Sequence, residues 1–214
     1  MGNCCCDPRG CDAFFGERFA RRVAKRYRAK GLDRTAQRIV DFLADQGIDG
    51  ATVLEIGGGV GEIGLELLRR GASSVTNLEL SPGYEEHAAA LVAENGFTGR
   101  VHRRLVDIAA DPGDVAAADL VVLHRVVCCY PDYERLLGAA ADHCRVRLAF
   151  SHPPRNLVSR AIIASQNAIC GLSRRDFRAF VHPPAAMVGV VEAQGMRPAF
   201  RHAGRVWQAA GLTR

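Results

Sequence analysis

The sequence lacks the long apolar segments that a membrane span requires. A transmembrane helix needs roughly 20 consecutive apolar residues, and the longest apolar candidate, residues 119–130, is interrupted by His124 and Arg125. The first twelve residues also contain no apolar core of the kind found in secretory signal peptides. We therefore expect a cytoplasmic protein without a membrane span.

Aromatic residues make up only 7% of the chain, and no internal repeat or low-complexity linker is visible. The 48% hydrophobic and 24% charged content is nevertheless that of an ordinary globular domain, which excludes a disordered or fibrous protein. A chain of 214 residues can build one core without disulfides or a structural metal, because it buries roughly 70% of its unfolded surface. We expect one catalytic domain and no structural metal.

Excess positive charge is confined to the start of the chain. Residues 1–30 hold eight Lys or Arg against three Asp or Glu, whereas the remaining residues hold 20 of each sign. Seven of these basic residues lie between positions 18 and 30, in a segment with apolar side chains at helical spacing (Phe19, Val23, Tyr27). Such a segment could meet nucleic acid, an acidic membrane surface or an anionic substrate. The simpler interpretation is a solvated helix with one buried stripe.

The eight cysteines follow no zinc-binding pattern. Four lie near the start of the chain, two are adjacent, and two are isolated (Cys4, Cys5, Cys6, Cys11; Cys128, Cys129; Cys144, Cys170). Three consecutive cysteines followed by a fourth are not a C-x-x-C…C-x-x-C arrangement. The N-terminal cluster could hold a thiol or a metalloid, or it could be a set of exposed thiols on a flexible terminus.

Strand-like and helix-like segments alternate along the chain, which is typical of an α/β fold with a mainly parallel sheet. We expect helices at residues 12–30, 33–46, 62–70, 82–95, 133–143 and 184–194, and strands at residues 51–56, 75–80, 100–106, 120–124 and 146–151. Two further strands, residues 197–202 and 205–210, are divided by Ala203-Gly204 and should close the sheet as an antiparallel hairpin. The prediction is a doubly wound sheet of seven strands with an antiparallel last strand.

The most specific motif runs from Val53 to Gly64, VLEIGGGVGEIG. Glycines directly after a strand and before a helix let the backbone approach a ligand and direct free amides at it, so a nucleoside site is expected. Part of the segment also satisfies the dinucleotide pattern G-x-G-x-x-G. Glu55 decides between the two cofactor classes, because a pyrophosphate has no use for a carboxylate there, whereas a cationic amino-acid group does. Glu79, at the end of the next strand, is placed to accept hydrogen bonds from two ribose hydroxyls.

This spacing resembles the class I S-adenosylmethionine-dependent methyltransferases, in which E/D-x-G-x-G-x-G opens the domain and an acid closes the second strand. The resemblance covers residues 50–214 and implies a Rossmann-like fold with S-adenosylmethionine as cofactor. It implies cofactor contacts from the first motif, from the second strand and from the end of the third strand beside the adenine (Glu55, Gly57, Gly59, Gly61; Glu79, Leu80; Asp107, Ile108). The segment Leu120–Arg125 looks like the family's fourth strand, whose end borders the sulfonium and the substrate.

The second half of the chain is most similar to the magnesium-protoporphyrin O-methyltransferase type. The shared features are Tyr130-Pro131, Ser151-x-Pro153-Pro154, the segment Phe177–His182 and Trp207. This resemblance implies that Tyr27 closes over the cofactor. The chain has Cys129 where that group has a histidine immediately before the tyrosine, which argues against a porphyrin substrate.

Methyl transfer requires alignment of the acceptor, exclusion of water and, for a hydroxyl or a protonated amine, removal of one proton. The candidate groups for this work are His124, Tyr130, His182 and Tyr27. An imidazole suits a general base near neutral pH, which favours His124 or His182. Arg125 could pair with an acceptor carboxylate, or it could form a salt bridge beneath the N-terminal helices.

The leading hypothesis is an S-adenosylmethionine-dependent methyltransferase that acts on a small molecule. We divide the chain into a Cys-rich flexible terminus (residues 1–11), a helical lid (residues 12–48) and the methyltransferase domain (residues 49–214). One alternative is methylation of a thiol or metalloid held by the N-terminal cysteines, and another is a non-catalytic cofactor-binding module. A nucleic-acid methyltransferase is disfavoured because no Asn-Pro-Pro-Tyr or Asp-Pro-Pro-Tyr motif follows the fourth strand. A nicotinamide reductase is disfavoured because no tyrosine has a lysine four residues on.

Overall fold

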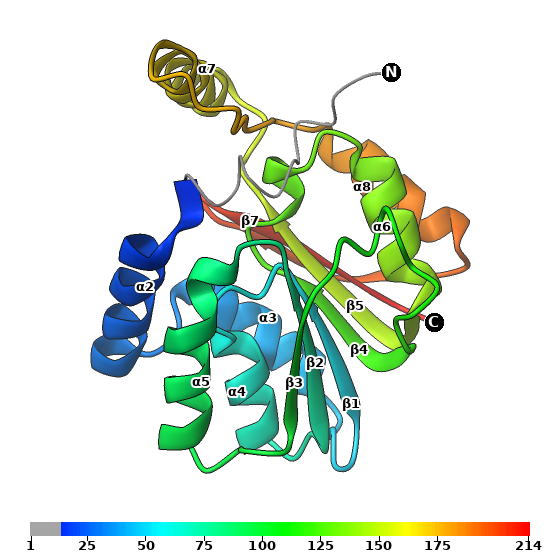
Figure 1. Ribbon diagram of the computed structural model, residues 1–214. Coiled ribbons are helices and arrows are strands. Elements are labelled where there is room, and N and C mark those ends of the chain that lie inside the picture. Colours follow the sequence, from blue (N-terminus) through cyan, green and yellow to red (C-terminus); the bar gives the residue numbers. More distant parts are fainter. Residues whose placement is uncertain (1–13) are drawn as a thin grey trace.

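The computed structural model describes residues 14–214, and within them seven strands form one sheet in the order β3-β2-β1-β4-β5-β7-β6 (Figure 1). The strands are β1 (Thr52–Ile56), β2 (Ser74–Glu79), β3 (Val101–Leu105), β4 (Ala118–Leu123), β5 (Cys144–His152), β6 (Arg197–Ala203) and β7 (Gln208–Thr213). The α-helices are α2 (Glu17–Lys30), α3 (Arg34–Ala44), α4 (Glu62–Arg69), α5 (Glu85–Glu94), α6 (Tyr133–Asp142), α7 (Leu157–Leu172) and α8 (Pro184–Ala193), with short 3-10 turns at η1 (Pro82–Tyr84) and η2 (Val127–Cys129). The expected Cys-rich terminus, with Cys4, Cys5, Cys6 and Cys11, lies outside the described residues.

The strand pairing confirms the predicted doubly wound topology. Strands β1 to β5 pair in parallel, with Val53 opposite Leu120 across β1 and β4. Strand β7 runs antiparallel to both of its neighbours, and Ala149 of β5 lies opposite Gly211. The order in which strands are added to the sheet changes direction between β1 and β4. In folds of this kind, ligands bind in the crevice at the carboxyl ends of the two strands where this change occurs.

Helices cover both faces of the sheet, as Figure 1 shows, with α3, α4 and α5 on one side and α6 and α8 on the other. Alternate residues of each strand point to opposite faces of the sheet. Leu54 and Val121 pack on the side of α6 and α8, whereas Val53 and Val122 pack on the side of α3 and α4. Because both of its faces are buried, the central strand β4 is an almost continuous apolar run, which is why the sequence indicated it clearly.

The two N-terminal helices have different surroundings. Asp33 caps α3 by accepting hydrogen bonds from the backbone amides of Thr35 and Ala36, and α3 then packs against the sheet through Ile39 and Leu43. Helix α2 instead lies against η1 and α5 and buries one stripe, formed by Ala20, Ala24 and Tyr27. The stripe agrees with the solvated-helix interpretation of the basic segment. Helix α3 belongs to the layer that packs on the sheet, whereas α2 packs on η1 and α5.

The structure differs from the sequence-based expectation in two elements. Helix α7, Leu157–Leu172, was not predicted. The last strand begins at Gln208 rather than at position 205, because Ala203 pairs with Gln208 and the turn between the strands therefore takes four residues. Gly204 is required in this turn, since a Cβ there would lie 2.1 Å from the carbonyl oxygen of Trp207.

Candidate active site

A cavity lies at the carboxyl ends of β1, β2 and β4. The glycine turn after β1, the end of β2 and the segment after β4 form most of its wall, and α2 and the residues just before it close one side. The lining residues are Phe15, Phe19, Val23, Arg26, Glu55, Gly57, Gly58, Gly59, Val60, Glu62, Ile63, Glu79, Leu80, Tyr84, His124, Arg125, Val126, Cys129 and Tyr130. The predicted motif residues of the first two strands and the fourth-strand segment thus meet at one place.

The glycines of the turn after β1 are needed for their backbone conformation. Gly57, Gly59 and Gly61 have φ angles of 61°, 55° and 84°, in the left-handed region that disfavours other residues. A Cβ on Gly57 would also lie 2.6 Å from the side chain of Val126. The turn is tied to β2 by the amide of Gly57, which donates to the carbonyl of Leu78 at 2.7 Å. The backbone can therefore approach a ligand more closely than a chain with side chains would allow.

Glu79 holds the glycine turn against the end of β2. Its Oε2 accepts from the amide of Gly59 at 2.8 Å, and its Oε1 accepts from the amides of Leu80 and Ser81 at 2.7 and 3.1 Å. These bonds fix the carboxylate in one orientation at the cavity wall. A carboxylate oxygen accepts more than one hydrogen bond, so the group can also receive hydroxyl donors from a ligand.

Glu55 is a buried carboxyl at the cavity wall, only 3% exposed. It accepts hydrogen bonds from the Asn77 side-chain amide at 2.9 Å and from the amide of Gly64 at 3.3 Å. Burial, with a contribution from the nearby charge of Glu62, raises the pKa of Glu55 to about 8. A cationic ligand group beside it would stabilise the ionised form, so this wall suits a cationic ligand.

Three side chains lie close to Asp33: Arg26 from α2, and His124 and Arg125 from the segment after β4. His124 Nε2 lies 3.4 Å from Asp33 Oδ2, in ion-pair range but without the alignment of a hydrogen bond. The Arg125 guanidinium donates to the same oxygen at 2.7 Å, and the guanidinium of Arg26 lies 4.0 Å from it. Burial raises the pKa of Asp33, but the contacts with His124, Arg125 and the Ala36 amide outweigh it and hold that pKa well below its usual range.

Ser151 supports this cluster from β5. Its Oγ lies 3.0 Å from Nδ1 of His124 and accepts from the backbone amide of Arg125 at 2.8 Å. Arg125 adopts a left-handed φ of 62°, and its guanidinium lies 5.0 Å from the centroid of the Trp207 ring. The sequence left two roles open for Arg125, and the structure places it in the salt bridge beneath the N-terminal helices.

Glu62 is a cavity residue that sequence reasoning missed. It is the first residue of α4, directly after the glycine turn, and burial raises its pKa, while a hydrogen bond to its own backbone and the nearby side chains of His124 and Arg125 oppose that rise. Asp33 and Ser151 were missed as well. The only sequence signal for Asp33 is its place immediately before a helix, which indicates a cap and not a partner for His124.

Tyr130 lines the cavity and donates from its hydroxyl to Asp107 Oδ2 at 3.0 Å. Asp107 also accepts from the amide of Ala109 through Oδ1. Asp107 and Ile108 lie behind Tyr130 rather than among the lining residues, and Ile108 is buried in the core. Gly61 likewise shapes the turn without lining the cavity.

Tyr27 and His182, two of the proposed catalytic groups, do not line the cavity. The Tyr27 hydroxyl donates to Glu66 at 2.8 Å and accepts from Arg69 at 2.9 Å, between α2 and α4. Burial, helped by Glu66, raises the pKa of Tyr27 well above its usual range. His182 Nε2 lies 2.9 Å from the carbonyl oxygen of Tyr130, and burial lowers the pKa of His182. In this arrangement His182 contacts Tyr130 from behind the cavity wall.

Cys128 and Cys129 place their sulfurs 3.7 Å apart in η2, and Cys129 lines the cavity. Cys144 and Cys170 are buried elsewhere as free thiols. Within residues 14–214 no group of three or more metal-ligating side chains is present. The part of the chain that the structure describes also contains no helix long and apolar enough to cross a membrane.

The fold is a Rossmann-like, nucleoside-binding α/β fold. Its defining features are a mainly parallel sheet with this strand order, a glycine turn after β1, and acidic residues at the ends of β1 and β2. A family profile described as "Methyltransferase domain" matches residues 25–210. The chain belongs to this methyltransferase family, which confirms the fold and the class of enzyme expected from the sequence. No curated protein sequence matches the chain.

Solved structures share the fold at low sequence identity. Magnesium protoporphyrin IX methyltransferase (ChlM) from Synechocystis PCC 6803, with bound SAH (S-adenosylhomocysteine), is 21% identical with a TM-score of 0.71, over 95% of this chain and 99% of that chain. An O-methyltransferase family protein from Burkholderia thailandensis is 19% identical with a TM-score of 0.69, over 95% and 62%. Human N-acetylserotonin methyltransferase in complex with SAM (S-adenosylmethionine) is 16% identical with a TM-score of 0.64, over 92% and 55%.

Proposed function

We propose that this methyltransferase transfers a methyl group from S-adenosylmethionine to a small molecule that binds between α2 and the end of β4. The observation that carries the proposal is the cavity itself. The glycine turn, Glu55, Glu79 and His124 all line this cavity, and the His124 ring lies between Ser151 and Asp33. Residues suited to a methyl donor and a candidate base therefore share one cavity.

The residues at the cavity wall suit the parts of this cofactor. The space beside Gly57, which the Cβ of any other residue would fill, would let the nucleoside lie close to the backbone. Glu79 would accept the ribose hydroxyls, and the Leu80 backbone lies beside it. Glu55 would face the cationic amino-acid end, and Tyr130 with Asp107 would border the adenine. When bound, S-adenosylmethionine supplies an electrophilic methyl group on a sulfonium.

His124 would act as the general base for the acceptor. Ser151 Oγ can accept from Nδ1 of His124, and in that tautomer Nε2, a buried atom without a hydrogen-bond partner among the described residues, would take a proton from an acceptor hydroxyl or ammonium. Asp33, 3.4 Å from Nε2, would stabilise the imidazolium that results. Asp33 would therefore be a positioning and charge-stabilising residue that touches no reacting atom.

The α2 side of the cavity would bind the acceptor and exclude water. Phe15, Phe19 and Val23 offer apolar and aromatic surface there, and Arg26 adds one positive charge at the edge. An acceptor with an aromatic or aliphatic body and an anionic group fits these walls. We assign Arg125 a structural role, because its guanidinium already contacts Asp33 and Trp207.

We also propose a cytoplasmic location and no nucleic-acid substrate. The four described cysteines are free thiols, as is usual in a reducing compartment. Part of the positive charge of helix α2 is paired within the protein, since Arg28 donates to Glu94 at 2.8 and 2.6 Å.

The proposal is tested by label transfer from methyl-labelled S-adenosylmethionine. The protein is incubated with this donor and an extract that has been separated into small-molecule, RNA and protein fractions. We expect label in the small-molecule fraction with the wild type and at least a tenfold lower rate with Glu79→Ala, since that variant loses a charged acceptor for the donor. Label that enters only RNA or protein would contradict the proposed substrate class.

A further inference from the structure

Helix α7 exposes an apolar surface that the methyltransferase site does not use. Five large apolar side chains on it are 61–85% exposed (Leu157, Val158, Ile162, Ile169, Leu172). Large apolar side chains that are exposed to water together on one helix usually mark a site of interaction. Figure 1 shows that α7 projects away from the sheet and from the helices that cover it.

Only a narrow side of α7 is attached to the rest of the protein. Cys170 is its one buried residue and packs with Phe177 and Ala179. Asn167 donates to the carbonyl of Ala179 at 2.8 Å and accepts from its amide at 2.9 Å. The helix is thus held in place at its inner side while its outer side faces solvent.

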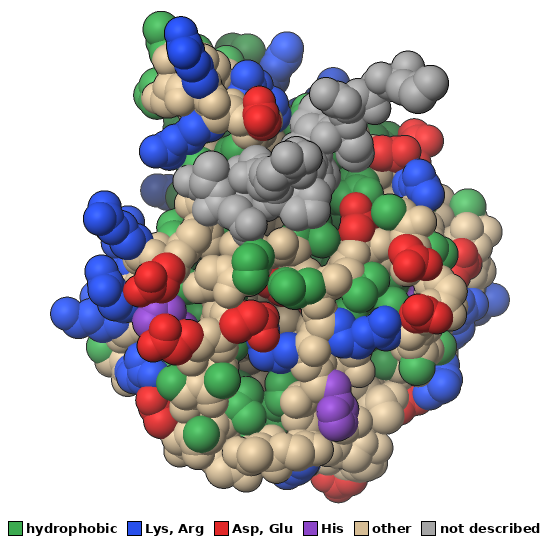
Figure 2. Space-filling view, viewed as in Figure 1, with side chains coloured by type: hydrophobic (Ala, Val, Ile, Leu, Met, Phe, Trp, Pro, Cys, Tyr) green, Lys and Arg blue, Asp and Glu red, His purple; other side chains and the backbone are tan. Residues whose placement is uncertain are grey.

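The charges around this apolar surface have one sign. Residues 155–178 contain five arginines, one aspartate and no lysine or glutamate. Arg155, Arg160, Arg174 and Arg175 are exposed, and no carboxylate within residues 14–214 forms an ion pair with them. Figure 2 shows basic and apolar side chains side by side over α7.

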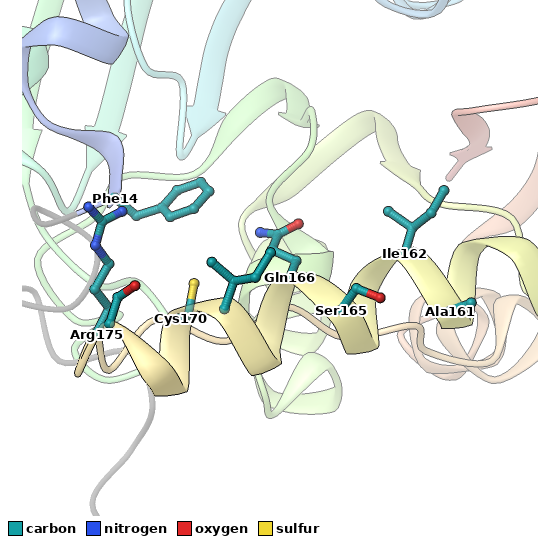
Figure 3. A pocket seen from close by; sticks show the side chains of 9 residues that line it. Phe14, Ala161, Ile162, Ser165, Gln166, Cys170 and Arg175 are labelled. Atoms are coloured by element: carbon teal, nitrogen blue, oxygen red, sulfur yellow. The ribbon is translucent and has the colours of Figure 1, made fainter.

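A crevice of about 460 Å³ runs along one flank of α7, between the contact through Cys170 and the exposed side chains of Ile162 and Ile169. Its lining is mainly apolar, with Phe14, Ile162, Ile169 and Cys170, and Arg175 stands at one end (Figure 3). An apolar crevice with a positive charge at its end offers space for an acyl chain whose anionic headgroup stays near the arginine.

We propose that α7 docks on the surface of an anionic lipid bilayer. The apolar side chains would enter the boundary between headgroups and acyl chains, and the arginines would meet anionic headgroups, as in helices that lie in the plane of a membrane. A second copy of the chain is a poorer occupant, because a two-fold contact would place this arginine-rich surface against itself. The inference goes beyond methyl transfer and does not depend on it.

Vesicle flotation with the full chain tests the proposal. We expect the protein to float with vesicles of phosphatidylcholine mixed with phosphatidylglycerol, to bind pure phosphatidylcholine at least tenfold more weakly, and to be released by salt. Ile162→Ser with Ile169→Ser should weaken binding tenfold or more. Arg174→Ser with Arg175→Ser should weaken it about thirtyfold, about 2 kcal/mol, because each arginine near an anionic surface contributes about 1 kcal/mol.

Matched control variants lie away from α7. Val146 is a 45% exposed apolar residue near the start of β5, and Arg38 and Arg197 are exposed arginines on α3 and β6. Val146→Ser, and Arg38→Ser combined with Arg197→Ser, should each change vesicle binding less than twofold. Circular dichroism should show that all variants remain folded.

Three outcomes would overturn the proposal. One is the absence of flotation with anionic vesicles, and another is flotation that the α7 variants leave unchanged. The third is a concentration-dependent dimer in light scattering that Ile162→Ser with Ile169→Ser dissociates while vesicles bind neither form. Since flotation is measured without methyl donor, its failure would leave the proposed methyl transfer untouched.

Discussion

His124 and Asp33 face each other across 91 positions of the sequence, with Nε2 of the imidazole 3.4 Å from Oδ2 of the carboxylate. Asp33 belongs to the cap of α3, whereas His124 follows the central strand β4. The contact therefore joins the N-terminal helices to the edge of the sheet where the cofactor motif lies. Through this contact the packing of α3 determines the surroundings of the proposed base.

His124→Gln should lower kcat by about 10² to 10⁴, because the substitution removes the group that takes the acceptor proton. Binding of S-adenosylhomocysteine should stay within about threefold, since the glycine turn and Glu79 are unchanged. Label transfer and calorimetry on the same preparation measure the two effects. His102→Gln, at an exposed position of β3, is the matched control. Equal rates for His124→Gln and the wild type would remove His124 from the mechanism.

Asp33→Asn should destabilise the protein at neutral pH by about 1–3 kcal/mol, because it removes a charge that Arg125 and His124 face. The pKa of Asp33 is held below its usual range, so the native state gains stability from the ionised carboxylate above that range and loses it as the pH falls. Urea unfolding should therefore show a difference between variant and wild type that shrinks from pH 7 toward pH 3. Asn keeps the helix cap.

The matched control for Asp33→Asn is Asp114→Asn, at an exposed position that forms no ion pair with the described residues. It should change the free energy of unfolding by less than about 0.5 kcal/mol at either pH. A difference between Asp33→Asn and the wild type that is the same at pH 7 and pH 3 would contradict the charge pairing.

Glu55→Gln should make the stability of the protein depend less on pH between about 5 and 8. Because the pKa of Glu55 is raised to about 8, the unfolded chain releases this proton at a lower pH than the native protein does. Native stability should therefore fall as the pH rises from about 5 to 8, by at most about 1.4 kcal/mol per pH unit for one proton. Urea unfolding of Glu55→Gln should lack that part of the slope, and Glu86→Gln, at an exposed position, should retain it. Identical slopes for Glu55→Gln and the wild type would show that Glu55 is ionised in the native state.

Gly57→Ala and Gly189→Ala form a matched pair of glycine substitutions. At Gly57 the φ angle is 61° and the new Cβ would lie 2.6 Å from Val126, so we expect at least a tenfold loss of cofactor affinity and about 1–3 kcal/mol of lost stability. At Gly189, in α8, no atom lies within 4 Å of the new Cβ, so helix propensity should stabilise the protein by about 0.5–1 kcal/mol. Calorimetry and thermal unfolding measure both effects. Normal binding by Gly57→Ala would argue against the close approach of the nucleoside to the backbone there.

The part of the site that lies within one strand-turn-helix unit could be predicted from the sequence. The glycines and Glu55 are adjacent in the chain, and Glu79 ends a strand that must lie beside the first one, so local patterns determine their relative positions. The alternation of strand-like and helix-like segments predicted a mainly parallel sheet, and the buried strand β4 is recognisable as a short apolar run.

The acceptor side could not be predicted in the same way. The contacts of Asp33 and Ser151 with His124 depend on how α3 and β5 pack, and no spacing in the sequence encodes that packing. Tyr27 belongs to a set of apolar residues at helical spacing, which indicates that its side chain is buried but not what the side chain faces. Its hydroxyl bonds to Glu66 rather than entering the cavity. Helix α7 was missed because most of its large apolar residues are exposed, and only Cys170 on its inner side is buried, so they form no stripe that faces the core.

Calorimetry of the purified protein with S-adenosylhomocysteine and, separately, with NAD tests directly whether the cavity is a methyl-donor site. We expect micromolar affinity for S-adenosylhomocysteine, about −7 to −8 kcal/mol, and no measurable heat with NAD. Glu79→Ala should weaken the first interaction by roughly 2–3 kcal/mol, because a charged acceptor for two hydroxyls is lost. Tight binding of NAD without binding of S-adenosylhomocysteine would contradict the proposal that the cavity binds a methyl donor.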